Sequence, residues 1–386
     1  MGYPAVSSVL WGTVDLCPRG HVPTAAEHSG LRFSRGPYCR DVDDAGSGTR
    51  GLKPTITPAV IHAVQRTWDL ELDRAVALGG STGLNLLVDA RHGRVVVRLH
   101  RAHVTGARVH ALQVAREAAA LGGVPTARTI LGRHGERHVC ADPWVIEVEE
   151  FIDSDAKMDA LPRIREAMPL LARLHAALER ADLPDAADDL SFGNYLDAAD
   201  IATKKSAGVQ RIRGLHASLH PIADMADTVA AELAATPTST DPLADQWCHG
   251  DYWDDNVLFR NGHIVLVADF GYMNRRPRID DLALTLYFTL WELDATGYPN
   301  PAAELAALVD AYDRGAQRPL ADNERSALPL ALARQSLWSI GVWAVELDDD
   351  AMVIAHLQGQ DAALTRALDI LEHIDQWQTA FHHASG

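Results

Sequence analysis

The sequence predicts an α+β fold in two parts: a smaller part of short strands and helices, then a larger and mainly helical part. Short apolar runs bounded by turn residues concentrate between residues 84 and 152, as expected for strands joined by tight turns. Segments with helical periodicity dominate after residue 161. A chain of 386 residues is long enough to bury a core in both parts.

The charge and hydropathy of the chain exclude some functional classes. Asp and Glu outnumber Lys and Arg by 52 to 35, which gives a net charge of −17 and argues against a nucleic-acid partner bound through its phosphates. The same balance is compatible with a cationic substrate, although an acidic proteome or solubility explains it equally well. No apolar run approaches the ~18 residues of a membrane span, so no membrane partner is expected.

Cysteine usage and the start of the chain predict a location. The four cysteines are scattered without CxxC spacing, which disfavours a disulfide scaffold or a zinc site and favours a reducing compartment. The start lacks a cationic region followed by an apolar core, so no signal peptide is expected. We therefore predict a soluble cytoplasmic protein, as a monomer or a homodimer.

The predicted helices and strands begin after an N-terminal segment that shows no pattern of secondary structure. Residues 1–52 mix Gly, Ser, Pro and charged residues without a sustained period, and we expect a flexible extension there. Thr57-Pro58 is a helix start with an N-cap and a proline at the first position, and apolar residues follow on one helical face. Leu84 to Val88 and Val95 to Leu99 are the first strands, with a turn at residues 91–93.

A helix and further strands complete the first part. The helix is predicted from Ala107 to Leu121. Three more strands follow at Ala127 to Leu131, around His138 to Ala141, and at Trp144 to Ile152. The glycine-rich segment Leu78 to Gly83 precedes the first long strand, and glycines there let backbone N–H groups approach phosphates closely.

The second part is predicted to be mainly helical. An amphipathic helix runs from Leu161 to Leu178, in which Pro169 predicts either a kink or the true start. His175 on this helix is expected to pack. Residues 181–242 are polar loops with one helical run. The predicted helices are Ile222 to Ala235, Asp281 to Asp294, Pro301 to Ala316, Ala327 to Val345 and Asp361 to Thr379.

Between these helices lies a predicted β-hairpin. Its two strands are Val257 to Phe259 and Ile264 to Ala268, joined by Asn261-Gly262, a dipeptide typical of a type I′ turn. Pairing Arg260 with His263 sets Asn256 opposite Val267. Asp269 is then two residues further, roughly 7 Å along the strand.

The open end of this hairpin is a candidate metal and catalytic site. Asn256 and Asp269 supply hard oxygen ligands of the kind that suit Mg²⁺ with substrate phosphates. His249-Gly250-Asp251 lies just upstream and adds a second carboxylate. Asp251 could accept or orient a hydroxyl proton during phosphoryl transfer.

The ordered set of these residues resembles the aminoglycoside phosphotransferase and choline kinase family of small-molecule kinases, distant relatives of protein kinases. The matching residues are His249, Gly250, Asp251, Asn256, Asp269, Phe270 and Gly271, followed by Asp280 or Asp281 before Leu282-Ala283. The resemblance implies an α+β, bilobal protein-kinase-like fold, with a small antiparallel β-sheet and one helix in the first lobe and a larger, mainly helical second lobe. It divides the chain into an extension at 1–52, a nucleotide-binding lobe at 53–150 and a catalytic and substrate-binding lobe at 151–386.

The resemblance also implies roles for further residues. Arg98 stands where the family places a phosphate-binding Lys, a departure that keeps the charge but changes its geometry. Glu117 on the following helix would pair with it. Backbone around Glu150 and Ile152 would meet the adenine, and His249 would brace the catalytic loop. The phosphate-contacting glycine-rich residues would be Gly80, Ser81, Thr82 and Gly83.

Aromatic and acidic residues near the motif form a candidate wall for a cationic acceptor. They are Trp253, Asp254, Asp255 and Trp291, and carboxylates beside indoles suit an ammonium group. The alternative is that the tryptophans belong to the core and the carboxylates are solvated.

The predicted function is ATP- or GTP-dependent, Mg²⁺-assisted phosphorylation of a small-molecule hydroxyl. Acceptor classes are an aminoglycoside-like antibiotic or other cationic metabolite. A choline-, homoserine- or sugar-kinase-like role in metabolism or natural-product biosynthesis is an alternative. A protein kinase is disfavoured by the HGD triplet and the lack of an APE motif. A non-catalytic nucleotide-binding protein predicts loss of Asp251 or Asp269, and both are present.

Overall fold

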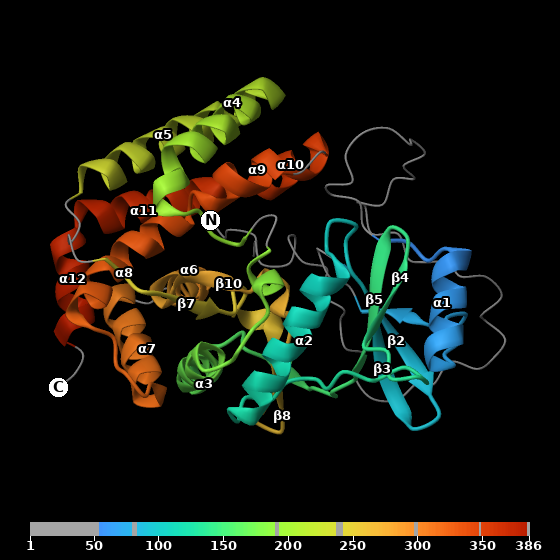
Figure 1. The fold of residues 1–386 in the computed structure, drawn as a ribbon. Helices are drawn as coiled ribbons and strands as arrows, with labels where there is room; N and C mark the ends of the chain where they lie inside the picture. The colour runs from blue at the N-terminus through green and yellow to red at the C-terminus, as the bar shows by residue number, and fades with distance from the viewer. Residues whose placement is uncertain are drawn as a thin grey trace. The chain divides into compact units, whose positions relative to one another are not determined.

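The computed structural model describes residues 54–78, 83–189, 193–236, 242–296, 300–346 and 349–383. The chain divides into two compact units. Unit 1 comprises the chain up to Gly106 together with Thr129–Phe151, and unit 2 comprises Ala107–Arg128 and the chain from Ile152 onward (Figure 1). The proposed extension at residues 1–52 lies outside the described residues.

Unit 1 contains an antiparallel sheet of five strands in the order β1-β2-β3-β5-β4. Its strands are β1 (Val76–Ala77), β2 (Leu84–Ala90), β3 (Gly93–Leu99), β4 (His138–Ala141) and β5 (Trp144–Glu150). Helix α1 (Pro58–Trp68) begins as predicted, because the Thr57 side chain accepts a hydrogen bond from the Val60 amide at 3.3 Å. This confirms the predicted N-cap.

One face of the sheet and helix α1 form the core of unit 1. Val60 and Val64 of the helix are buried with Val97 of β3 and Ile146 of β5. Alternate residues of the same strands, among them Arg98, point to the opposite face because side chains alternate along a strand. The alternation of side chains along the strands thus separates an apolar core from the face that carries Arg98.

The strand predicted at Ala127 to Leu131 is wrong. Only one bridge, between Thr129 and Glu149, forms there. The reason lies in β5, whose residues from Trp144 to Glu147 already pair with β4 on that side and leave only its end open.

Unit 2 is mainly helical (Figure 1). Its longer helices are α2 (Gly106–Leu121, in this unit from Ala107), α3 (Leu161–Glu179), α4 (Ser206–Leu215), α5 (His220–Ala235), α6 (Arg278–Thr296), α7 (Pro301–Gly315), α8 (Asp322–Gln335), α10 (Asp350–Leu357), α11 (Gln360–Glu372) and α12 (Ile374–His383). Helix α3 continues through Pro169, which therefore does not mark its start.

Three helical predictions need correction. The single helix expected from Ala327 to Val345 ends at Gln335, and a π-helix (η8, Ser339–Trp343) and a short helix α9 (Ala344–Glu346) follow. The helix expected from Asp361 to Thr379 is interrupted at His373 between α11 and α12. Apolar periodicity continues across both breaks and does not reveal them. Helix α4 and the preceding π-helix at Ile201–Lys205 were missed within a polar stretch.

Two small sheets carry the loops of the candidate site. Strands β7 (Asp245–Cys248) and β10 (Asn274–Pro277) pair in one, and β6 (Ala156–Lys157), β8 (Val257–Arg260) and β9 (His263–Val267) form the other. The β8–β9 hairpin is the predicted one. Asn261 and Gly262 have φ values of 53° and 79°, which confirms the positive φ expected at both turn positions.

The predicted register of this hairpin is wrong by one residue at its open end. Arg260 pairs with His263 as expected, but the register shifts between Leu258 and Phe259, so that Val257 faces Val267. Asn256 consequently faces Ala268, whose amide donates to the Asn256 carbonyl at 2.8 Å. A β-bulge, which hydropathy does not reveal, brings Asn256 one residue nearer to Asp269.

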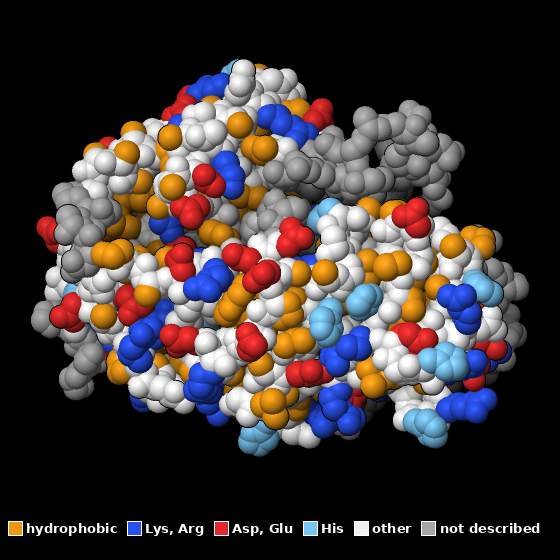
Figure 2. All heavy atoms as spheres, in the orientation of Figure 1, with side chains coloured by type: hydrophobic (Ala, Val, Ile, Leu, Met, Phe, Trp, Pro, Cys, Tyr) orange, Lys and Arg blue, Asp and Glu red, His pale blue; other side chains and the backbone are white. Residues whose placement is uncertain are grey.

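The surface shows no large field of one sign on the face drawn in Figure 2, where acidic and basic side chains are interspersed. Among the described residues, no helix combines the length and hydropathy that crossing a bilayer requires.

The turn of the β8–β9 hairpin provides a test of the local backbone. Gly262 has φ 79° and no heavy atom near an added Cβ, so Gly262→Ala should lower the free energy of unfolding by about 1 kcal/mol through backbone strain alone. Gly214 in α4 is equally open but helical, and Gly214→Ala should leave stability unchanged or raise it by up to about 1 kcal/mol. Urea unfolding of the two variants measures both; a Gly262→Ala protein that is as stable as wild type would contradict the turn geometry.

Candidate active site

The candidate site is built on the loop that follows β7. Gly250 in this loop has φ 83°, in the left-handed region that favours glycine. A Cβ at Gly250 would lie 2.1 Å from the Tyr272 carbonyl oxygen, so no side chain fits. The loop therefore packs its backbone directly against the segment that follows Asp269.

Asp281, at the start of α6, fixes this loop through hydrogen bonds to its backbone. Its carboxylate accepts hydrogen bonds from the backbone amides of His249 at 2.8 Å and Gly250 at 2.9 Å. It also accepts from Arg276 at 3.1 Å and from His175 Nε2 at 3.0 Å. Burial alone would raise its pKa, but the His175 hydrogen bond and the Arg276 charge outweigh burial and hold the pKa well below its usual range.

Of the two acidic residues in the motif, Asp281 therefore contacts the loop that follows β7. Asp280 forms an ion pair with Arg334 of α8 instead. Two adjacent carboxylates on one helix thus have different tasks, because they point to different neighbours.

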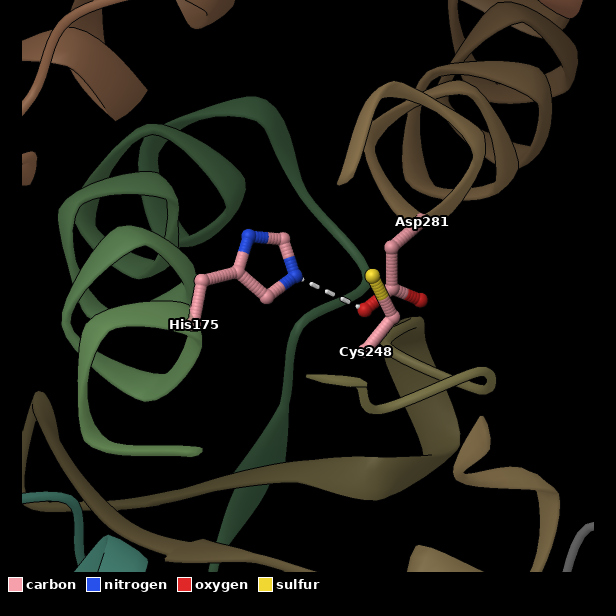
Figure 3. Close-up of side chains that lie close together, drawn as sticks. All are labelled: His175, Cys248 and Asp281. Carbon is pink, nitrogen blue, oxygen red and sulfur yellow. Dashed lines mark hydrogen bonds and ion pairs between the residues drawn. The ribbon is translucent and has the colours of Figure 1, made fainter. Parts of the chain in front are cut away.

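His175, Cys248 and Asp281 lie together in the interior, from α3, the end of β7 and α6 (Figure 3). The spacing of their ligand atoms would suit a metal ion, but their hydrogen bonds describe a different arrangement. His175 uses both ring nitrogens, since Nδ1 accepts from the Tyr312 hydroxyl at 2.8 Å. Burial raises the pKa of the Cys248 thiol, which stays protonated, and four donors occupy the Asp281 carboxylate. We therefore interpret this cluster as a hydrogen-bonded support, in keeping with the packing role expected for His175.

Asp251 is the buried carboxylate of the loop, with 8% of its surface exposed. Asn256 Nδ2 donates to its Oδ2 at 2.7 Å, and Asn194 Nδ2 donates to its Oδ1. Burial raises the pKa of Asp251, and the negative charge of Asp269 raises it further, while these two amide donors oppose the shift. Asp251 is thus a fixed carboxylate whose ionised form has a proton affinity above the usual one.

Asp269 follows the hairpin in a left-handed conformation, with φ 54°. The Asn256 amide nitrogen faces Asp251, which leaves its side-chain oxygen for another partner. An amide oxygen and a carboxylate are hard donors, and the mutual repulsion of Asp251 and Asp269 favours a cation beside them. These residues therefore fit a divalent metal ion.

His249 connects the loop to the hairpin. Its Nε2 donates to the Ala268 carbonyl at 2.9 Å, and its Nδ1 accepts from the Asp251 amide at 3.2 Å. Burial lowers the pKa of His249, so the ring stays neutral and can do both. His249 thus contacts both Ala268, which precedes Asp269, and Asp251.

The structure places the predicted acceptor-wall residues in varied surroundings. Trp253 is buried, with its ring 4.8 Å from that of Phe288. Asp254 and Asp255 lie 2.9 and 2.5 Å from the Lys157 ammonium, and burial raises the pKa of Asp254 to about 6. The half-buried Trp291 packs beside Tyr287.

The predicted nucleotide-binding residues divide between the units. In unit 1, Arg98 Nε lies 3.6 Å from Glu149 Oε1, and Glu150 ends β5. Gly83 precedes β2, and a Cβ there would be 3.0 Å from the Leu99 carbonyl oxygen. Glu117 on α2 and Ile152 belong to unit 2. Gly80, Ser81 and Thr82 lie outside the described residues.

Sequence reasoning missed residues that the structure places against the site. Asn194 contacts Asp251 from 57 positions away, and no motif marks it. Arg108 of α2 is buried and donates to the carbonyls of Ala187, Gly271 at 3.2 Å and Met273 at 2.5 Å, fixing the segment after Asp269. Burial lowers the pKa of this guanidinium to about 10. Arg108 lies in the first turn of α2, but Gln113 and Arg116 of the same helix are buried as well, so the sequence does not distinguish it.

Comparison with known proteins identifies the class. A family model described as the phosphotransferase enzyme family matches residues 74–330, and the chain belongs to this family. The resemblance inferred from the catalytic motifs is thereby confirmed.

Curated relatives match over shorter stretches. A homoserine kinase of Gluconobacter oxydans (strain 621H) is 31% identical over 162 residues, 42% of this chain and 46% of that protein. A homoserine kinase of Phenylobacterium zucineum (strain HLK1) is 34% identical over 114 residues, 28% of this chain and 32% of that protein. These alignments span less than half the length of the relatives.

Solved structures match over most of the chain. A microcompartment-associated aminopropanol kinase has a TM-score of 0.62 at 16% identity, covering 81% of this chain and 96% of that one. An amicoumacin kinase in complex with AMP-PNP, Ca²⁺ and Ami has a TM-score of 0.58 at 14% identity, covering 81% and 92%. At such identities the likeness concerns the fold, and it confirms the predicted protein-kinase-like α+β class.

The Asp281 support can be tested by removing its charge. Asp281→Asn places an N–H₂ group against donors and leaves Arg276 buried without its carboxylate, so the free energy of unfolding should fall by about 3–5 kcal/mol at pH 7. The folded-state pKa of Asp281 is depressed, so its contribution is present above the unfolded pKa of about 3.9 and is lost as pH falls toward the folded value. The gap between wild type and variant should therefore narrow below about pH 4.

Urea unfolding as a function of pH measures this gap. Asp159→Asn, which removes one partner of an exposed pair with Arg163, is the control and should cost no more than about 0.5 kcal/mol. A cost for Asp281→Asn as small as that of the control would show that Asp281 does not support the loop.

Proposed function

We propose that this protein transfers the γ-phosphoryl group of ATP to an alcohol hydroxyl of a small molecule. The observation that carries the proposal is the buried Asp251 carboxylate, held by Asn256 and adjacent to Asp269, on a loop fixed by Asp281. Membership of the phosphotransferase enzyme family supports it. The relatives and structural neighbours named as kinases of homoserine, aminopropanol and amicoumacin support a small hydroxyl-bearing acceptor.

In this proposal Asp251 orients the acceptor hydroxyl and takes its proton. The hydroxyl oxygen forms a bond to the γ-phosphorus, the bond from that phosphorus to the β–γ bridging oxygen breaks, and ADP leaves. Burial and the Asp269 charge raise the proton affinity of Asp251, which favours this transfer.

Asn256 and Asp269 would hold the divalent ion, which we propose to be Mg²⁺. When bound, such an ion neutralises charge on the phosphate oxygens. His249 keeps both site segments in register through its contacts to Asp251 and Ala268. Arg98 would position the phosphates together with Gly83 and the glycine-rich residues that precede Gly83. The pairing of Arg98 with Glu117 stays a prediction, and the structure adds Glu149 as a neighbour of Arg98.

The acceptor is proposed to be a polar amine-bearing alcohol. The net charge of −17 is compatible with a cationic molecule, and the neighbours and relatives named as kinases of aminopropanol and homoserine support an amine-bearing one. Asp254 and Asp255 already face Lys157, so we expect their contribution to cation binding to be smaller than their number suggests. The alignments with homoserine kinases favour an amino-acid-like acceptor as the second candidate to an aminoglycoside-like one.

A screen for acceptor-dependent ADP release tests the proposal. Homoserine, aminopropanol, choline-like amines, aminoglycosides and sugars are offered with ATP and Mg²⁺. At least one hydroxyl compound should raise ADP release above the rate with water alone, and stimulation by no compound would count against a small-molecule kinase.

The role of Asp251 can be separated from nucleotide binding. Asp251→Asn keeps the size but removes the basic oxygen and retains an acceptor for only one of the two amide donors, Asn194 and Asn256. The kcat should therefore fall by about 10²–10⁴-fold while nucleotide affinity barely changes. Steady-state kinetics with the acceptor from the screen, or with water, measure the effect. The exposed Asp245→Asn on β7 is the control and should keep the wild-type kcat. A wild-type kcat in Asp251→Asn would assign the proton transfer elsewhere.

The metal assignment depends on Asp269. Calorimetry with a non-hydrolysable ATP analogue should show Mg²⁺-dependent binding that Asp269→Ala weakens at least about 10-fold, because a carboxylate ligand is lost. The binding of Asp245→Ala should match wild type. Equal affinity in wild type and Asp269→Ala would contradict the assignment.

A further inference from the structure

The segment from Gly193 to Tyr195 is fixed from two sides within unit 2. The Gly193 carbonyl accepts from Trp338 Nε1 at 3.0 Å, and the Asn194 carbonyl accepts from Gln335 Nε2 at 2.7 Å. On the other side, the Tyr195 hydroxyl accepts from Asn274 Nδ2 at 2.6 Å, and Arg276 lies 4.2 Å from the Tyr195 ring centre. The segment is therefore anchored to the end of α8 and to β10 at three successive residues.

This anchored segment sends one side chain to the catalytic carboxylate. Asn194, of which only 7% is exposed, donates through Nδ2 to Oδ1 of Asp251, while Asn256 donates to Oδ2. Each carboxylate oxygen has about two acceptor positions. One position on each oxygen is thus occupied by an amide, and the carboxylate plane is defined from both ends.

We propose that Asn194 is a positioning residue that fixes the Asp251 carboxylate for the acceptor hydroxyl. This inference rests on the proposed function. Asn256 alone would restrain the carboxylate group through Oδ2 only, because Asn256 contacts only Oδ2 and the backbone of Asp251, whereas Asn194 adds a second restraint at Oδ1. With Asn194 in place, the remaining acceptor positions point in fixed directions, as an in-line transfer requires.

The proposal also assigns a supporting role to Gln335 and Trp338 in the C-terminal part of the chain. Gln335 at the end of α8 and Trp338 just before the π-helix η8 hold the backbone of the segment. The orientation of the Asp251 carboxylate therefore depends on the position of this part of the chain. π-Helical turns are rare in proteins, and those that occur are often found at functional sites. Residues more than 80 positions from Asp251 in sequence thus reach the reacting atoms through a single side chain.

A purely structural Asn194 would predict something different. Loss of its amide would then lower stability and activity to the same degree whether or not Asp251 is present. A positioning residue acts only through Asp251, so its loss should matter only while that carboxylate is there to be positioned.

The experiment is a double-mutant cycle with ATP, Mg²⁺ and the acceptor from the screen, or water as acceptor. Asn194→Leu keeps the volume and removes the donor, and it should lower kcat by about 10- to 100-fold with little change in the KM for ATP. In the Asp251→Asn background, Asn194→Leu should cause no further loss. Asp245→Asn, at the exposed position on β7 that also serves as the control for Asp251→Asn, should keep kcat within about 2-fold of wild type. Asn194→Ala, which adds no bulk, repeats the cycle, and urea midpoints show that both variants are folded.

The outcomes separate the two levels of the proposal. A slow Asp251→Asn enzyme combined with a wild-type rate in both Asn194 variants overturns the positioning role alone. Full additivity of the losses from Asn194→Leu and Asp251→Asn also overturns it. A wild-type rate in Asp251→Asn overturns the proposed function and this inference together.

Discussion

One buried carboxylate, Asp281, determines the arrangement on which the site depends. Its carboxylate accepts hydrogen bonds from two successive backbone amides of the loop after β7, and also from the buried Arg276 and the His175 ring. Backbone amides in a buried loop need acceptors, because an unpaired buried N–H costs about 1–3 kcal/mol. Asp281 supplies both acceptors from the first turn of α6. The conformation of Gly250, and hence the direction of Asp251, follows from this anchor.

The carboxylates of Asp281 and Asp251 are both buried, but their hydrogen-bond donors and neighbouring charges differ. Asp281 has a guanidinium and three further donors, which keep it ionised, whereas Asp251 has two amide donors and the charge of Asp269 nearby. The same residue type therefore serves as a support at one position and as a proton acceptor in the proposed reaction at the other. Such separation of pKa values by environment is typical of acid–base sites. His249 is neutral because it is buried, and it connects the loop that carries Asp251 to the end of the β8–β9 hairpin.

The sequence alone was sufficient where the determinants are local. The Asn261-Gly262 turn, the Thr57 cap and the order of Asp251, Asn256 and Asp269 are encoded within short stretches, and the family resemblance of that order was confirmed. The one-residue bulge of the hairpin was not predictable, because β-branched and apolar residues fit either register. Contacts between distant positions were also invisible. Asn194 reaches Asp251 across 57 positions and His175 reaches Asp281 across 106, and no periodicity records such pairs.

The measurement that tests the account most directly is ³¹P nuclear magnetic resonance of the products. The protein is incubated with ATP, Mg²⁺ and a hydroxyl-bearing amine such as homoserine or aminopropanol, and the phosphorus signals are followed over time. The account predicts a phosphate monoester signal that grows in a one-to-one ratio with ADP. ADP accompanied only by inorganic phosphate for every acceptor, or bound but unreacted ATP, would contradict the claim that this loop transfers a phosphoryl group to a small-molecule alcohol.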